Sequence, residues 1–334
     1  MILSFMLYVT IPIEDSDLSL TTKPELLLEF IAEITRVKLF MIRIKHLIRG
    51  RHLSILRLDH QPHTDHRDPE EEICSNYAVN FVEGGSFGLA ANGKRWLLSS
   101  GYVFLSQPGA VHGYSHDEKF PSDVCLSVVY SGTLAEEISA EDYSVPASSA
   151  VVISPTNRLA FLKLRLERLA DDDYAFGLED LAYELFSVIR SGPLNANCVY
   201  RERQLLWYAE RIEAIRDIFN KRYADSHSLT SVARSVGMSP FQFARVFSEL
   251  VGTPPHRYLL SVRLDRAFQM LLDGNPVTET CFDVGFSNLS HFARSFQRRF
   301  GVVPSSLKAK SRVRPESVVQ KRKKVQAIQN QLLR

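Results

Sequence analysis

The sequence predicts an α+β protein of two domains: an N-terminal antiparallel β-barrel with two flanking helices, and an all-α C-terminal domain with two helix-turn-helix units. Three observations predict this fold. One motif occurs twice in the last hundred residues. Residues 53–130 consist of short runs rich in Val, Phe, Tyr and Leu that alternate with turn residues, which is typical of antiparallel strands. A length of 334 residues favours two domains.

The repeated motif places a glycine two residues before a serine, and then a Phe-Ala-Arg-x-Phe segment. The first copy starts at Gly237 and the second at Gly285, 48 residues later. The two segments that follow are 243–247 and 292–296. A repeat of this kind indicates one supersecondary unit used twice.

Each copy is predicted to be a helix-turn-helix. In the first, apolar residues at helical spacing are Leu229, Val232, Ala233 and Val236. Gly237 is suited to end that helix, Ser239 to cap the next helix, and Pro240 to occupy its first position. In the second copy Gly285 is the predicted turn residue and Ser287 the predicted cap. A short turn containing glycine is typical of DNA-binding units.

The two copies are joined by a predicted helix, Pro255–Leu272, of 18 residues. At 1.5 Å per residue it would be ~27 Å long. Because one turn of DNA is ~34 Å, a rigid helix of this length would place two recognition helices in successive major grooves.

The C-terminal part of the sequence resembles a known protein family. Residues 231–239, 263–271, 283–296 and 298–304 match segments of the DNA-binding domain of AraC/XylS bacterial transcription regulators, and the resemblance covers about 205–307. It implies that helices 240–250 and 288–300 read DNA. The residues expected to contact DNA are Ser239, Pro240, Phe241, Gln242, Ala244 and Arg245 in the first unit, and Ser287, Asn288, Leu289, Ser290, Arg294 and Arg298 in the second.

These side chains differ in what they offer to a base pair. Arg245 and Arg294 can make two parallel hydrogen bonds to a guanine edge. The apolar members, Phe241, Ala244 and Leu289, offer only contacts such as those with thymine methyls. A rival interpretation remains open for both arginines, in which each pairs with an acid of its own domain or contacts only phosphate.

The first domain is predicted from strand and turn signals. Candidate strands are 54–58, 77–82, 86–90, 95–98, 102–105 and 124–129, and two helices are expected at 157–170 and 178–189. Breaks are expected at Gly84-Gly85 and, as a tight hairpin, at Asn92-Gly93. The basic segment 36–51 is interpreted as a helix.

Residues 50–190 are similar to the cupin-like effector-binding domain of AraC/XylS regulators. Gly101, Pro108-Gly109 and His112 match part of a cupin motif. The resulting division is an unassigned extension (1–50), a cupin-like effector-binding or dimerisation domain (51–192), a linker (193–204), the DNA-binding domain (205–308) and a basic tail (309–334).

A cluster of potential metal ligands complicates this interpretation. It comprises His60, His63, His66, Glu70, His112 and His116. Because the His-x-His with a spaced Glu of metal cupins is missing, no metal, cofactor or catalytic residue is expected, and the histidines are interpreted as exposed loop residues. Two alternatives stay open: a barrel that only dimerises, and a metal-binding cupin fused to a DNA-binding domain.

Charge and cysteine content favour an intracellular regulator. Residues 201–334 hold 23 Lys and Arg against 11 Asp and Glu, whereas residues 1–200 hold 17 against 27. Such an uneven charge distribution is typical of a domain that binds a polyanion joined to a domain that does not. Four widely spaced cysteines and no export or membrane signal indicate the cytoplasm. The family resemblance implies an activator, not an enzyme, whose partners are double-stranded promoter DNA, a small-molecule effector, RNA polymerase and a second copy of the chain.

Overall fold

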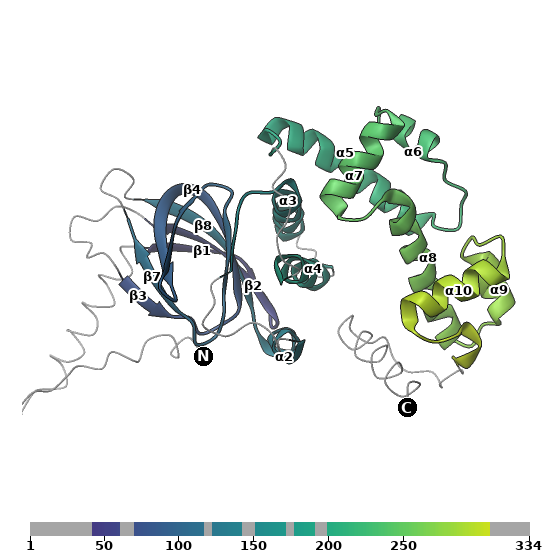
Figure 1. Ribbon diagram of the computed structural model, residues 1–334, viewed down its shortest axis with the longest axis horizontal. Helices are drawn as coiled ribbons and strands as arrows, with labels where there is room; N and C mark the ends of the chain where they lie inside the picture. Colours follow the sequence, from purple (N-terminus) through teal and green to yellow (C-terminus); the bar gives the residue numbers. More distant parts are fainter. Residues whose placement is uncertain are drawn as a thin grey trace, which may run out of the picture.

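The computed structural model describes residues 42–60, 70–116, 122–141, 151–171, 177–190 and 199–307. Figure 1 shows a β-sheet domain at one end, a helical domain at the other and helices between them. This arrangement confirms the predicted α+β architecture of two domains. The linker motif, most of the N-terminal extension and the basic tail lie outside the described residues.

Among the described residues, nine strands form the N-terminal sheet, and all of their pairings are antiparallel. They are β1 (Ile42–Arg49), β2 (Leu53–His60), β3 (Glu70–Ile73), β4 (Ala78–Ala91), β5 (Lys94–Ser99), β6 (Val103–Ser106), β7 (Val111–Ser115), β8 (Asp123–Tyr130) and β9 (Val151–Ile153). The main path runs β1-β2-β8-β4-β6-β9, while β5 and β7 pair with β4, and β3 pairs with β7.

The expected break at Gly84-Gly85 is wrong, because β4 continues through it. The pairing of β4 with β8 shifts register between Val82 and Gly84, which marks a bulge. Gly85 has φ +70°, and a Cβ there would lie 1.9 Å from the carbonyl oxygen of Ser122. The two glycines therefore bend one strand, which pairs with β6 and β8 before the bend and with β5 and β7 after it.

Two other local predictions have opposite outcomes. The helix expected at 36–51 is wrong over its described part, since Ile42–Arg49 is a strand paired with β2. The hairpin at Asn92-Gly93 is confirmed, since both residues have positive φ, 50° and 72°, between β4 and β5.

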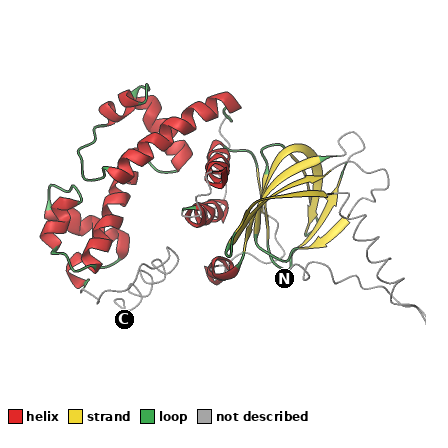
Figure 2. Cartoon of the chain, turned by 180° about the vertical axis from the view of Figure 1, so that it is seen from behind, coloured by secondary structure: helices red, strands yellow, loops and turns green. Residues whose placement is uncertain are grey.

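Three helices cover one face of the sheet, and Figure 2 shows them between the strands and the C-terminal helices. They are α2 (Gly132–Glu141), α3 (Asn157–Asp171) and α4 (Leu178–Arg190), of which the last two were predicted. Their apolar faces share a core with strand residues such as Ile55, Phe81 and Leu126. Tyr130 is fully buried there and its hydroxyl donates to the carbonyl of Ala182, 2.8 Å away.

The other face of the sheet forms a second core around Phe87, Leu89 and Phe104. Histidines enter this region, so the expectation that they lie in exposed loops is wrong for three of them. His112 is on β7 and completely buried, and the side chains of His60 and His116 are only 15% and 5% exposed. His63 and His66 lie outside the described residues, as does the side chain of Glu70.

The C-terminal domain consists of six α-helices and one 3₁₀ turn within the described range 199–307. They are α5 (Glu202–Lys221), α6 (Leu229–Ser235), α7 (Pro240–Val251), α8 (Pro255–Leu272), α9 (Val277–Asp283), α10 (Leu289–Phe300) and η2 (Pro304–Ser306). No described helix is both long and apolar enough to cross a membrane.

Candidate nucleic-acid interface

The first helix-turn-helix has the local structure that its sequence predicts. Gly237 follows the end of α6 with φ +67°, a left-handed conformation that glycine adopts without strain. The Ser239 hydroxyl accepts a hydrogen bond from the backbone N–H of Gln242 at 3.2 Å, and Pro240 begins α7. Phe243 and Phe247 are fully buried, so the opposite side of α7 faces outward.

The second unit repeats this design with one change. Gly285 forms the turn with φ +86°. The predicted cap Ser287 is wrong, because the Asn288 side chain accepts from the backbone N–H of His291 at 2.9 Å and caps α10. Asn is as good an N-cap as Ser. Counted from the turn glycine, α10 begins one residue later than α7 does in the first copy. Phe292 and Phe296 are fully buried.

The outward faces of the two helices hold the residues expected to contact DNA. In the first unit Ser239, Pro240, Phe241 and Arg245 are exposed, and Gln242 and Ala244 are half-buried. Phe241 is 80% exposed, which is unusual for a large aromatic residue unless a ligand covers it. The members in the second unit are all exposed: Ser287, Asn288, Leu289, Ser290, Arg294 and Arg298.

The two candidate base-reading arginines have different surroundings. The Arg245 guanidinium lies 3.8 Å from the Glu249 carboxylate and donates to the Tyr200 hydroxyl at 3.3 Å. Arg294 donates only to the backbone carbonyl of Ser290, one turn earlier on α10, and no ion pair of Arg294 occurs among the described residues. The rival interpretation, pairing with an acid, therefore has structural support for Arg245 and none for Arg294.

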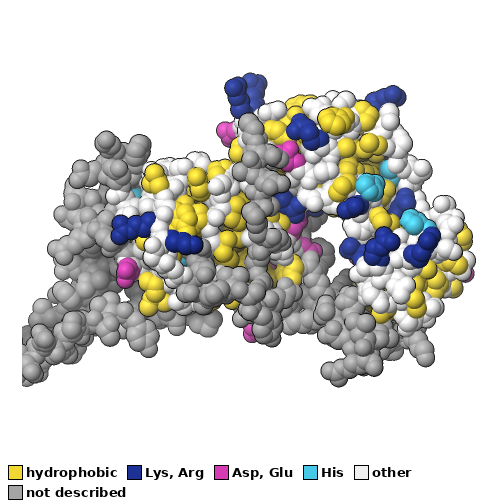
Figure 3. Space-filling view, viewed as in Figure 1, with side chains coloured by type: hydrophobic (Ala, Val, Ile, Leu, Met, Phe, Trp, Pro, Cys, Tyr) yellow, Lys and Arg dark blue, Asp and Glu magenta, His cyan; other side chains and the backbone are white. Residues whose placement is uncertain are grey.

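Helix α8 belongs to both units and fixes the distance between them. Leu259 near its start lies in the core of the first unit, whereas Phe268 and Leu271 lie in the core of the second. The Arg263 side chain donates to the backbone carbonyls of Tyr223 and Asp225, at 2.7 and 2.8 Å. These contacts hold α8 against both units. In Figure 3, Lys and Arg side chains gather over the C-terminal helices, as expected of a surface that meets phosphates.

Helix α3 of the first domain docks against α7. Asn157 donates to Glu249 at 2.6 Å and accepts from the backbone N–H of Tyr200 at 2.7 Å. The Tyr200 hydroxyl donates to the other Glu249 oxygen at 2.5 Å. Burial, and then the Glu249 carboxylate, raise the pKa of Tyr200, so this hydroxyl remains a donor. The network that holds Arg245 therefore includes a residue of the N-terminal domain.

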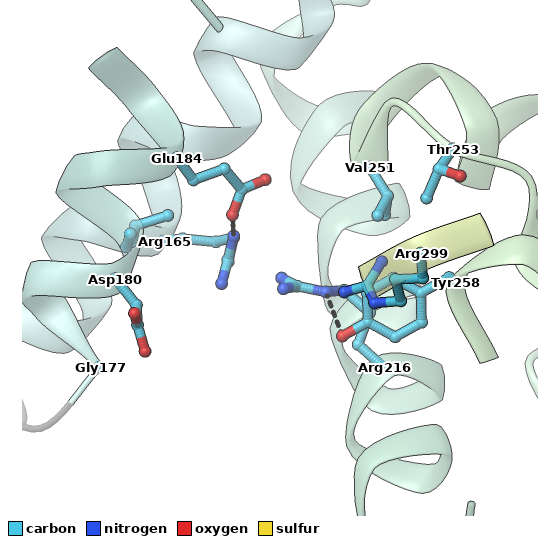
Figure 4. Close-up of a pocket in the computed structure, with 10 residues that line it drawn as sticks. Arg165, Gly177, Asp180, Glu184, Arg216, Val251, Thr253, Tyr258 and Arg299 are labelled. Atoms are coloured by element: carbon cyan, nitrogen blue, oxygen red, sulfur yellow. Dashed lines mark hydrogen bonds and ion pairs between the residues drawn. The ribbon is translucent and has the colours of Figure 1, made fainter. Parts of the chain in front are cut away.

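A pocket of about 590 Å³ lies beside this contact, between α3 and α4 on one side and the C-terminal helices on the other. In Figure 4 the guanidinium groups of Arg165 and Arg216 point toward one another across it. Burial, and then Arg216, lower the pKa of Arg165, but ion pairs with Glu184 at 3.0 Å and Glu213 at 3.2 Å compensate its charge. The junction between the domains is thus polar and charge-paired around this pocket.

Phe161 shows how closely the two domains are joined. This α3 side chain is 1% exposed and packs in the core of the first helix-turn-helix, whereas its neighbour Leu162 packs in the core under the sheet. We expect Phe161→Ala to cost about 3–5 kcal/mol in the unfolding of the helical domain. Leu162→Ala is the matched control and should destabilise the sheet domain by about 2–5 kcal/mol.

The two tryptophans separate these effects, because Trp207 lies on α5 and Trp96 on β5. Urea denaturation is followed in the full chain with either Trp96→Phe or Trp207→Phe as background. Phe161→Ala should lower the midpoint reported by Trp207 more than that reported by Trp96, and Leu162→Ala the reverse. Equal shifts from both changes would show that the two cores unfold as one unit.

Paired helix-turn-helix units on a common spacer, joined to an antiparallel sheet domain, are the architecture of a DNA-binding transcriptional regulator. Comparison with known families agrees. A model of the AraC-like ligand binding domain matches residues 52–186, and a model of a helix-turn-helix domain matches residues 232–310. The chain belongs to the AraC family of transcriptional regulators, which are not enzymes.

Individual relatives match different shares of the chain. The HTH-type transcriptional regulator ExsA of Pseudomonas aeruginosa is 28% identical over 179 residues, 52% of this chain and 62% of its own length. The virulence regulon transcriptional activator VirF of Yersinia enterocolitica is 31% identical over 94 residues, 28% of this chain and 35% of its own length. The chain thus matches less than two thirds of either relative. A crystal structure of unsaturated fatty acid bound ToxT from Vibrio cholerae has 12% identity and a TM-score of 0.33, with 79% of this chain and 100% of that chain covered.

Proposed function

We propose that this chain is a sequence-specific activator of transcription that binds promoter DNA through α7 and α10 and responds to a small-molecule effector in its N-terminal domain. The observation that carries the proposal is the pair of capped recognition helices held on α8. Their exposed faces carry Arg294 and Arg298 from one unit and Phe241 and Arg245 from the other. The length of α8, ~27 Å, is close to the ~34 Å of one DNA turn and supports the proposal that the two helices enter adjacent major grooves on one face of the duplex.

The contact between α3 and α7 supports a response to an effector. Asn157 belongs to the ligand-binding domain, and Glu249 and Arg245 belong to the first recognition helix. An effector that favours one placement of α3 would change how often Glu249 holds Arg245 away from a base edge. It would thereby shift the population between DNA-competent and DNA-incompetent forms.

Activation is proposed from the relatives rather than from the site. The relative VirF, which resembles the chain over 94 residues, is named an activator. An activator at a promoter has RNA polymerase as a partner, and a second copy of the chain would extend the contacted site. Double-stranded promoter DNA is the partner that the exposed helices would contact directly.

The test uses the full chain and a random-sequence duplex library. We expect repeated selection to enrich a site with two conserved elements about one helical turn apart. Binding to that site should exceed binding to unselected duplex by at least roughly 10³-fold at physiological salt. A chain that binds all duplexes equally at moderate ionic strength would contradict the proposal, because phosphate contacts alone carry no sequence information.

A further inference from the structure

Three side chains that the DNA-binding function does not use converge at one end of the sheet domain. His60 ends β2, His116 directly follows β7, and Asp123 begins β8. His60 and Asp123 are register partners across β2 and β8. Although 56 and 63 residues of sequence separate His60 from the other two, the antiparallel pairing brings all three to the same place.

The nitrogen and oxygen atoms of this cluster are close enough to share one ion. Asp123 Oδ1 lies 2.7 Å from His116 Nε2 and 3.4 Å from His60 Nδ1, and the three donor atoms all lie within 4.8 Å of one another. The imidazole rings meet edge to face, with centroids 4.3 Å apart. The three side chains are only 15%, 5% and 10% exposed, so the cluster is partly shielded from water without being closed.

The surroundings orient the carboxylate. Asp123 Oδ1 accepts a hydrogen bond from the imidazole Nε2 of His116. The Cys125 thiol, two residues along β8, donates to Asp123 Oδ2 at 3.4 Å. The second oxygen is therefore engaged, and Oδ1 faces the imidazoles. Partners that orient a ligating group in this way are typical of metal sites.

We propose that His60, His116 and Asp123 form a binding site for a divalent transition-metal ion, with Zn²⁺ as the best match. Two imidazole nitrogens and one carboxylate oxygen suit Zn²⁺ and its neighbours, whereas Ca²⁺ and Mg²⁺ take oxygen ligands. With bonds of ~2.1 Å, tetrahedral ligand atoms lie ~3.4 Å apart. The His60–Asp123 distance already has this value, and His116 must withdraw by ~0.7 Å to admit the ion.

The proposal departs from the sequence-based expectation of no metal. It uses two of the six residues first considered, and its third ligand, Asp123, was not among them. His112, the residue that matches the cupin motif, takes no part: its Nδ1 lies 3.3 Å from the Tyr114 hydroxyl. Three protein ligands leave a fourth position open for water or for a donor atom of an effector. Since the three residues lie at the end of β2, directly after β7 and at the start of β8, a bound ion would also link these three strands.

The experiment titrates the full chain, freed of metal by chelation, with Co²⁺ and then with Zn²⁺. Co²⁺ in a four-coordinate nitrogen and oxygen site gives visible d–d absorption, and Zn²⁺ should remove it by competition at one ion per chain. We expect micromolar or tighter binding of Zn²⁺ by calorimetry. His116→Gln and Asp123→Asn, which keep side-chain size and hydrogen-bonding capacity, should each weaken it by on the order of 100-fold.

His46→Ala is the matched control, because His46 is an exposed histidine of the same domain on β1. It should leave Zn²⁺ affinity unchanged. No visible absorption from 100 μM Co²⁺ together with no calorimetric Zn²⁺ binding would overturn the proposal, and this result needs no variant to fold. Binding that persists undiminished in His116→Gln would also overturn it. The three residues would then be a buried hydrogen-bonded ion-pair network.

Discussion

Gly285→Val should destabilise the second helix-turn-helix by roughly 2–6 kcal/mol, the sum of backbone strain and overpacking. Gly285 has φ +86°, a region that β-branched side chains strongly resist. A Cβ at this position would also lie 2.5 Å from the carbonyl oxygen of Ala224. That oxygen belongs to the backbone between α5 and α6, so the clash cannot be relieved by turning a side chain.

The Gly285→Val variant should lose structure in the second helix-turn-helix before the rest of the chain unfolds. Hydrogen exchange of the full chain, read on the amides of α9 and α10, should show lost protection there while the strand amides β2, β4 and β8 stay protected. The residues Phe292 and Phe296 depend on the turn for their burial. Sequence-specific DNA binding should be lost with the second recognition helix. Unchanged thermal melting of the variant would contradict this account.

Gly237→Val is the matched comparison, because Gly237 holds the equivalent place in the first unit. Its φ is +67°, but a Cβ there would meet no heavy atom within 4 Å. The cost should be backbone strain alone, about 1–2 kcal/mol. The difference between the two variants measures the close approach of Gly285 to Ala224. Equal losses would mean that the approach adds nothing.

The helical domain could be predicted in detail because its signals are local. Caps, turn glycines and helical periodicity all act within a few residues, and two copies of the motif support each other. The wrong cap shows the limit of this reasoning. Ser287 and Asn288 are adjacent good caps, and the repeat favoured Ser287 by analogy with Ser239, although the structure uses Asn288.

The sheet domain was harder to predict because its elements depend on distant partners. Strands β3, β7 and β9 have three to five residues, too few for alternation to stand out. Strand β1 is basic and exposed on much of its surface, so only its pairing with β2 identifies it. The bend in β4 appeared to be a break because glycines mark both.

The candidate sites show the same difference between features set by local sequence signals and features set by contacts between distant residues. The outward faces of α7 and α10 follow from periodicity, so the expected DNA-contacting residues are at least partly accessible. The docking of Asn157 on Glu249 links residues 92 positions apart, and no pattern in the sequence predicts it. Burial of Phe161 was predictable from its helix, but the domain that buries it was not. The same holds for Asp123, which meets His60 only through strand register.

Arg294→Ala should relax the base preference of the chain at one position of its site. Arg294 is exposed, and its one contact among the described residues is the Ser290 carbonyl of its own helix. It can therefore extend into the major groove without breaking an ion pair. An arginine with two hydrogen bonds to guanine contributes about 1–3 kcal/mol of discrimination, so the variant should lose roughly 5- to 150-fold in preference at that base pair. Binding curves on a selected site and on its single-base variants measure this loss.

Arg299→Ala separates base reading from general charge, because it removes the same side chain five residues along α10. Arg299 makes two hydrogen bonds with the Asp265 carboxylate, 2.9 and 2.8 Å long, so it is already engaged within the domain. Its loss should leave base preference unchanged and affinity lower by a few-fold at most, since exposed ion pairs contribute about 1 kcal/mol or less. If Arg294→Ala instead weakened binding equally on every sequence, with a shallower dependence on salt, Arg294 would be a phosphate contact. Base reading by the second unit would then fall to Asn288, Leu289 and Ser290 at the start of α10.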